Sequence, residues 1–132
     1  MEKNAKHSVL VVDDDPQIFK IVSRILNPNR YEVEKAQDGE EALKKISKYK
    51  PVLLLLDLMM PGMSGIEVCQ KIKGSPGSKE IMILVLTAKD GQIDRRRCFE
   101  SGADDFLVKP FHIDSLARKI EYMIGKKGFA LN

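Results

Sequence analysis

The sequence has little of what marks secreted, membrane-spanning or metal–thiolate proteins. It contains no tryptophan, two cysteines and two histidines among 132 residues. Cys69 and Cys98 are too few for a disulfide scaffold and lack metal-ligand spacing, so we interpret both as core side chains in a reducing compartment. Apolar runs reach only strand length, and no signal-peptide pattern follows the N-terminus. We therefore expect a cytoplasmic protein that does not enter a membrane.

A strong charge bias is also missing. The chain has 22 basic and 19 acidic residues, a net charge of +3, and its basic residues are spread along the sequence without interleaved aromatics. This pattern does not favour direct binding to nucleic acid. The composition, 43% hydrophobic and 31% charged, is typical of a soluble globular protein. The length predicts one domain with a core large enough to need no staples.

What the sequence does contain is a regular alternation of apolar runs and amphipathic segments. Runs typical of strands lie at residues 9–12, 31–35, 52–57, 81–86 and 106–108. Each is followed by a helical pattern, beginning near residues 16, 38, 66, 90 and 113. Asp15 is expected to cap the first helix, with Pro16 at its first position, and Gly125 to end the fifth. The fourth helix, 90–101, has a poor apolar stripe.

This β–α alternation predicts an α/β fold with a five-stranded parallel sheet. Strands joined by helices run parallel through right-handed crossovers, and such sheets carry helices on both faces. The continuous apolar run at 52–56 agrees with this arrangement, because a strand buried on both faces needs no polar alternation.

A parallel sheet delivers the carboxyl ends of its strands to one edge, where open α/β sheets bind their ligands. Those ends carry Asp13 and Asp14, Asp57, Thr87 and Lys109. Each residue alone has an ordinary interpretation, respectively a helix cap, a turn, a β-branched strand residue and a solvated charge. Their joint placement favours a functional site.

The residue types at this edge favour phosphoryl chemistry. Clustered carboxylates repel one another unless a cation joins them, and a few carboxylate oxygens with waters suit Mg²⁺. Lys109 adds a second positive charge and Thr87 a hydroxyl donor. Such a set can hold the anionic oxygens of a phosphoryl group. Asp57, at the centre, could accept that group as an aspartyl phosphate.

These residues lie in motifs that resemble the receiver (REC) domain of two-component response regulators, over about residues 8–124. The matching segments are VVDD at 11–14, DGEEAL at 38–43, Asp57 followed by MPGMSG at 60–65, TA at 87–88, GADDF at 102–106 and KPF at 109–111. The family fold is flavodoxin-like, with strand order 2-1-3-4-5. The bond before Pro110 is usually cis in the family.

The resemblance implies a role for each site residue. Asp57 matches the phosphoacceptor. Asp13 and Asp14 match the acidic pair that binds Mg²⁺ together with Asp57, and the backbone carbonyl of Met59 matches a further ligand. Such domains take the phosphoryl group from a sensor histidine kinase, a phosphotransfer protein or a small phosphodonor. They also catalyse their own dephosphorylation, and are signalling switches rather than enzymes.

The resemblance also implies a switch and an output surface. Lys109 matches the lysine that pairs with a phosphoryl oxygen, Thr87 the hydroxyl that turns toward it, and Phe106 the aromatic switch position. The face formed by the fourth helix, fifth strand and fifth helix would then change shape and control an output. A homodimer through this face is a further hypothesis, based on Asp104, Asp105 and Arg118 between residues 102 and 119. Residues 1–125 are expected to form the receiver domain, and 126–132 a C-terminal tail or the start of a linker.

Two departures from the family pattern and three alternative functions bear on this interpretation. The switch position holds Phe106 rather than Tyr, and Met59 and Lys89 stand where the family tunes access of the attacking water, so phosphoryl lifetime is undetermined. An unphosphorylated receiver-like binding module would lack the acid pair, Thr or Lys, and all are present. A Mg²⁺-dependent phosphohydrolase would usually have an acid at position 59, where this chain has methionine. A nucleotide-binding fold would have a glycine-rich loop after the first strand, and no such loop is present.

Overall fold

The computed structural model describes residues 6–60, 62–88 and 95–129, which form five strands and five helices in alternation. The strands are β1 (His7–Val12), β2 (Tyr31–Ala36), β3 (Leu53–Asp57), β4 (Met82–Ala88) and β5 (Asp105–Lys109). The helices are α1 (Pro16–Ile25), α2 (Gly39–Tyr49), α3 (Gly65–Lys73), α4 (Arg95–Glu100) and α5 (Ile113–Lys126). No helix in the described part of the chain has the length and apolar character needed to cross a bilayer.

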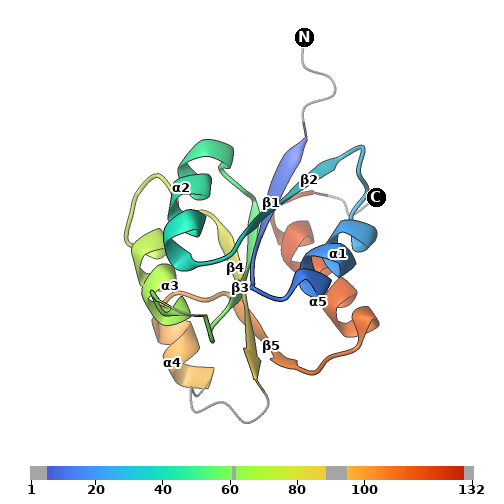
Figure 1. Ribbon diagram of the computed structural model, residues 1–132. Coiled ribbons are helices and arrows are strands. Elements are labelled where there is room, and N and C mark those ends of the chain that lie inside the picture. The colour runs from blue at the N-terminus through green and yellow to red at the C-terminus, as the bar shows by residue number, and fades with distance from the viewer. Residues whose placement is uncertain (1–5, 61, 89–94, 130–132) are drawn as a thin grey trace.

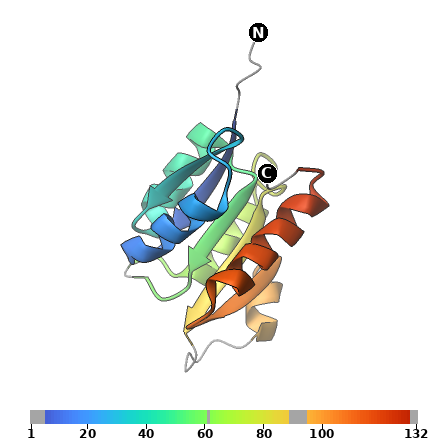
Figure 2. The same ribbon diagram turned by 90° about the vertical axis from the view of Figure 1, so that its right-hand side faces the viewer.

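The strands form one parallel sheet in the order β2-β1-β3-β4-β5. Helices α1 and α5 cover one face, and α2, α3 and α4 cover the other (Figure 1). Figure 2 shows α1 and α5 side by side in front of the sheet. The predicted α/β fold, strand order and two-sided covering are therefore confirmed.

Each face of the sheet has its own apolar core. Successive residues of β3 point to opposite faces, so Leu54 and Leu56 pack beneath α2 and α3 while Leu53 and Leu55 pack beneath α1 and α5. All four are fully buried, which explains why this strand shows no polar alternation. Cys69 and Cys98 are both buried in the first of these cores, as predicted.

Side-chain caps define where the helices on both faces begin. Asp15 accepts a hydrogen bond from the Gln17 N–H at 2.9 Å, with Pro16 at the first helical position, as predicted. Asp38 accepts one from the Glu41 N–H at 2.9 Å and begins α2. Each cap therefore sets the start of a helix immediately beyond the sheet edge that carries the predicted site.

The end of α5 differs from the sequence-based expectation. The helix continues through Gly125 to Lys126, and the left-handed residue is Gly128, with φ 85°. The Phe129 N–H bonds to the Ile124 carbonyl at 3.3 Å and the Gly128 N–H to the Gly125 carbonyl at 3.0 Å, which is a Schellman motif. Gly125 was a wrong choice of terminator, because only the second glycine has the positive φ that this motif requires.

The Schellman motif returns the chain to the beginning of the sheet. The ring of Phe129 lies 4.0 Å from the ring of His7 and packs against the core beneath α1 and α5. The start of β1 and the end of α5 are thereby held together, at the opposite end of the sheet from the predicted site. Residue 129 is thus part of the packed structure, four residues beyond the boundary expected at 125.

Other sequence-based bounds shift by a few residues. Strand β4 includes Thr87 and Ala88, and β5 includes Asp105 and Lys109, because both strands pair fully with their neighbours. Helix α4 is described from Arg95, so the expected part at 90–94 lies outside the described residues, as does Lys89. The Lys109–Pro110 bond is cis, as the resemblance implied.

Candidate functional site

Strand register brings the predicted site residues to one edge. Val12 pairs with Leu56, so Asp13 and Asp57 follow paired positions on neighbouring strands. Beyond β3 in the same sheet, Ala88 at the end of β4 pairs with Lys109 at the end of β5. The carboxyl ends of β1, β3, β4 and β5 therefore lie together, as the parallel topology predicted.

Three carboxylates gather at this edge. One oxygen from each of Asp13, Asp14 and Asp57 lies within 4.8 Å of the others. Asp13 and Asp57 are buried, while Asp14 is exposed. The donors are all hard oxygens, with no described histidine or cysteine in the cluster, so their chemistry fits Mg²⁺ better than a softer metal.

Lys109 places a positive charge directly beside two of these carboxylates. Its Nζ lies 2.9 Å from Asp13 Oδ2 and 3.6 Å from Asp57 Oδ2. It comes from the last residue of β5, 96 residues from Asp13 in the sequence. One ammonium group thus joins the ends of the first, third and fifth strands.

Backbone donors hold the two buried carboxylates in place. The Met59 N–H donates to Asp57 Oδ1 at 3.0 Å, and the Asp15 N–H donates to Asp13 Oδ1 at 2.9 Å. Each carboxylate therefore has one oxygen held by the loop that follows its own strand and the other directed toward Lys109. The side chain of Met59 extends outward and is 61% exposed.

The two predicted switch residues lie near the edge but outside the carboxylate cluster. Thr87 is buried, and its hydroxyl donates to the Ala88 carbonyl at 3.2 Å. Phe106 is half-buried, with its ring edge-on to Phe99 of α4 at a centroid distance of 6.0 Å. The structure therefore brings Asp13, Asp14, Asp57 and Lys109 together. The Thr87 hydroxyl bonds instead to its neighbouring carbonyl, and the Phe106 ring contacts α4.

The electrostatics of the site show that charge is crowded there. Burial raises the pKa of Asp13 above its ordinary value, and the negative charge of Asp57 adds to this rise. Burial alone would lower the pKa of Lys109, but its hydrogen bond to Asp13 and the charges of Asp13 and Asp57 outweigh it and raise that pKa. The ammonium is thus strongly held in its charged form, while Asp13 is ionised at a cost.

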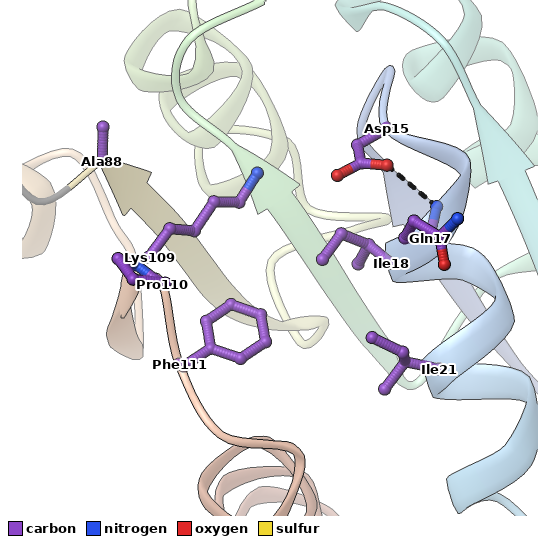
Figure 3. A pocket seen from close by; sticks show the side chains of 8 residues that line it. All are labelled: Asp15, Gln17, Ile18, Ile21, Ala88, Lys109, Pro110 and Phe111. Carbon is purple, nitrogen blue, oxygen red and sulfur yellow. Dashed lines mark hydrogen bonds between the residues drawn. The ribbon is translucent and has the colours of Figure 1, made fainter.

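An open cavity of about 850 Å³ adjoins the site. In Figure 3, Ile18 and Ile21 of α1 face Pro110 and Phe111 across it, and Lys109 borders the same space. Its walls are largely apolar, and Asp15 and Gln17 form part of its rim. A partner's apolar side chains could therefore pack directly beside the carboxylates.

Sequence reasoning missed two further charged pairs, which lie where β4 and β5 begin, at the opposite edge of the sheet from the site. Lys73 Nζ donates to the Ile81 carbonyl at 2.7 Å and to Asp104 Oδ2 at 3.0 Å. Asp104 also accepts from the Ile83 N–H at 2.8 Å, and Lys119 holds Asp105 at 3.0 Å. Only the acids in the GADDF motif signalled these pairs, since nothing local in the sequence identifies their lysine partners.

The comparison with known families decides the class of this site. The family model described as the response regulator receiver domain matches residues 9–121. The chain belongs to this family. It is therefore a signalling switch domain rather than an enzyme of the ordinary kind, and the acidic cluster at residues 13, 14 and 57 is typical of the magnesium site of receiver domains. Membership also implies a cognate histidine kinase.

Curated relatives and solved structures agree with this family. The response regulator MprA of Mycobacterium tuberculosis is 41% identical over 116 residues, covering 88% of this chain and 50% of its own length. The chain thus spans about half the length of the curated relatives it matches. A putative response regulator from Chloroflexus aurantiacus superposes with a TM-score of 0.81 at 35% identity, covering 92% of this chain and 99% of that chain. The chemotaxis response regulator CheY4 of Vibrio cholerae superposes with a TM-score of 0.79 at 34% identity, covering 90% of this chain and 99% of that chain.

Proposed function

We propose that this receiver domain accepts a phosphoryl group on Asp57 from a histidine kinase, a phosphotransfer protein or a small phosphodonor. The observation that carries the proposal is the position of Asp57. It is buried, held through Oδ1 by the Met59 N–H, and faces Lys109 Nζ at 3.6 Å through Oδ2. A carboxylate fixed in this way is a nucleophile beside a preorganised positive charge.

The transfer needs no general base, because the nucleophile is already an anion. A carboxylate oxygen of Asp57 forms a bond to phosphorus as the bond from phosphorus to the donor's histidine nitrogen breaks. The leaving nitrogen keeps the electron pair and takes a proton from solvent. Lys109 offsets the negative charge on the transferring oxygens, and Thr87 exchanges its bond to the Ala88 carbonyl for one to the phosphoryl group.

We assign the Mg²⁺ site to Asp13, Asp14, Asp57 and the backbone carbonyl of Met59. The fit rests on three carboxylate oxygens within 4.8 Å of one another, in a donor set made only of oxygens. When bound, the cation would supply positive charge to the phosphoryl oxygens. Burial, together with the negative charge of Asp57, raises the pKa of Asp13, and a bound cation would offset this cost of keeping Asp13 ionised.

The phosphodonor partner docks across the cavity between α1 and the chain after β5. Ile18, Ile21 and Phe111 offer it an apolar surface, and Lys109 joins that surface to the acidic cluster. A helix carrying a phosphohistidine could bury apolar side chains there while its phosphoryl group reaches Asp57 (Figure 3). The stimulus would reach the domain by this route.

The output of phosphorylation is a change in the face made by α4, β5 and α5. The added charge of about −1.5 to −2 draws Thr87 and Lys109 toward Asp57. Phe106 then moves into the space that Thr87 leaves, which breaks its edge-on contact with Phe99 of α4. We propose that the switching domain extends to Phe129, whose ring packs against the core beneath α1 and α5.

The proposal is tested with Asp57→Asn. We expect the wild-type chain to be labelled by a small acyl phosphate with Mg²⁺, and Asp57→Asn to lose the label. The matched control is Asp15→Asn, because Asp15 is an exposed helix cap outside the carboxylate cluster and asparagine caps equally well. It should be labelled like the wild type, and a chelator should abolish labelling of both.

Undiminished labelling of Asp57→Asn would overturn the assignment of Asp57. Failure of the folded wild type to take any label, from the acyl phosphate or from a phosphorylated histidine-kinase domain, would instead favour an unphosphorylated receiver-like binding module. Peptide mapping of the label separates a second acceptor from loss of the reaction.

A further inference from the structure

The six methionines of the chain differ sharply in exposure. Met59 is 61% exposed, whereas Met60 and Met123 are buried, and Met63 and Met82 are half-buried against the apolar cores. Met1 lies outside the described residues. Among the described methionines, therefore, only Met59 is largely exposed to a reagent in solution.

Met59 is also attached directly to the reacting carboxylate. Its N–H donates to Asp57 Oδ1 at 3.0 Å, two residues along the chain. Its exposed side chain therefore lies on the surface of the loop that follows β3, two residues from the acceptor. By contrast, the neighbouring Met60 is turned into the core beneath α2 and α3.

We propose that Met59 is an oxidation site through which hydroperoxides shorten the lifetime of the phosphorylated state. The thioether sulfur attacks one oxygen of the hydroperoxide, the O–O bond breaks, and the products are methionine sulfoxide and one molecule of water or alcohol. Sulfur is oxidised by two electrons and the peroxide is reduced by two, so no other reactant is needed. The effect on lifetime rests on the proposed function of Asp57.

The expected direction follows from polarity. The thioether of Met59 is apolar and holds no water, whereas a sulfoxide oxygen is a strong hydrogen-bond acceptor. Two residues from Asp57, it would bind and orient water close to the aspartyl phosphate. Hydrolysis of the phosphoryl group should therefore accelerate by roughly threefold or more, a small change in one barrier.

The experiment treats the full chain with hydrogen peroxide and maps sulfoxides by peptide mass spectrometry. We expect Met59 to be oxidised before the methionines at 60, 63, 82 and 123. The oxidised and untreated proteins are then labelled with an acyl phosphate and Mg²⁺, and the loss of label is followed after the donor is removed. Methionine sulfoxide reductase with a dithiol should restore the slower rate.

Each variant is compared with itself before and after peroxide. Met59→Leu should show no change in lifetime on treatment, while Met63→Leu and Met82→Leu should respond as the wild type does. The proposal is overturned if another described methionine is oxidised as fast as Met59. It is also overturned if oxidation at Met59 leaves the lifetime unaltered. If untreated protein takes no label, the proposed function fails, and the oxidation map still tests Met59 as the preferred site.

Discussion

At the scale of single residues, the site keeps a buried acid in an unfavourable state. Asp13 is buried, lies beside Asp57, and has a pKa raised above its ordinary value of about 3.9. Such a group binds protons more tightly in the folded state than in the unfolded state. The free energy of unfolding therefore falls as the pH rises from the ordinary pKa through the raised one.

This cost predicts that Asp13→Asn is more stable than the wild type without metal. In a chelator at pH 7, we expect the substitution to raise the free energy of unfolding by on the order of 1 kcal/mol. The gain should shrink as the pH falls through the raised pKa of Asp13 toward its ordinary value, because Asp13 of the wild type becomes neutral over that range. Denaturant titrations across this pH range measure the difference.

Magnesium provides the opposite readout for the same variant. Added Mg²⁺ should raise the melting temperature of the wild type, because a ligand that binds only the folded state stabilises it. It should raise that of Asp13→Asn much less. A variant that is less stable than the wild type in chelator at pH 7 would contradict this account of Asp13.

At the scale of elements, the end of α5 offers a comparison between two glycines. A Cβ added at Gly125 or at Gly128 would meet no atom within 4 Å, so packing does not distinguish the two positions. Only the backbone does, because Gly128 has φ 85° and Gly125 is helical. The two alanine variants therefore isolate a conformational effect.

We expect Gly125→Ala to stabilise the protein and Gly128→Ala to destabilise it. Alanine in a helix interior gains roughly 0.5–1 kcal/mol over glycine. In the left-handed region a Cβ costs roughly 1–2 kcal/mol. Thermal or urea unfolding measures both. Equal effects of the same sign would show that the helix ends at neither glycine in solution.

The same helix shows what sequence alone could and could not predict. Asp15, Asp38 and the run before Asp57 carry local signals, so the elements and the sheet edge followed from the sequence. Gly125 and Gly128 are equivalent as local signals, and the choice between them depends on Phe129 reaching His7 across the fold. A tertiary contact, which the local sequence does not reveal, therefore determines where α5 ends.

The candidate site divides in the same way. The carboxylates and Lys109 could be predicted because parallel topology determines where strand ends lie. The direction of the Thr87 hydroxyl could not be predicted, because it donates to the carbonyl of Ala88 in its own strand, at 3.2 Å. Nor could the Lys73–Asp104 pair, whose members are 31 residues apart and belong to no motif together.

At the scale of the whole molecule, apolar exposure is concentrated on one face. The described chain exposes five large apolar side chains, and four of them lie on α4, β5 and α5: Phe99, Val108, Ile113 and Tyr122. Asp104 and Asp105, which suggested a dimer from the sequence, are already paired with Lys73 and Lys119 of the same chain. Apolar contacts rather than these acids would therefore carry a homodimer.

We expect beryllium fluoride, as a phosphoryl mimic, to shift the wild type toward a dimer through this face. Tyr122→Glu should remain monomeric under the same conditions, because a charge would be buried in the contact. Lys20→Glu, at an exposed position of α1, is the matched control and should dimerise. Light scattering gives the mass, and a dimer formed equally well by Tyr122→Glu would exclude the face.

The contact between His7 and Phe129 places the two ends of the packed domain close together. With these two rings 4.0 Å apart, a short peptide linker could join the two ends of the domain, giving a backbone-cyclised protein. The join would lie at the opposite end of the sheet from Asp57, and the chain could be reopened in the loop at 74–78. The order of elements along the polypeptide could thus be permuted while the site stayed whole.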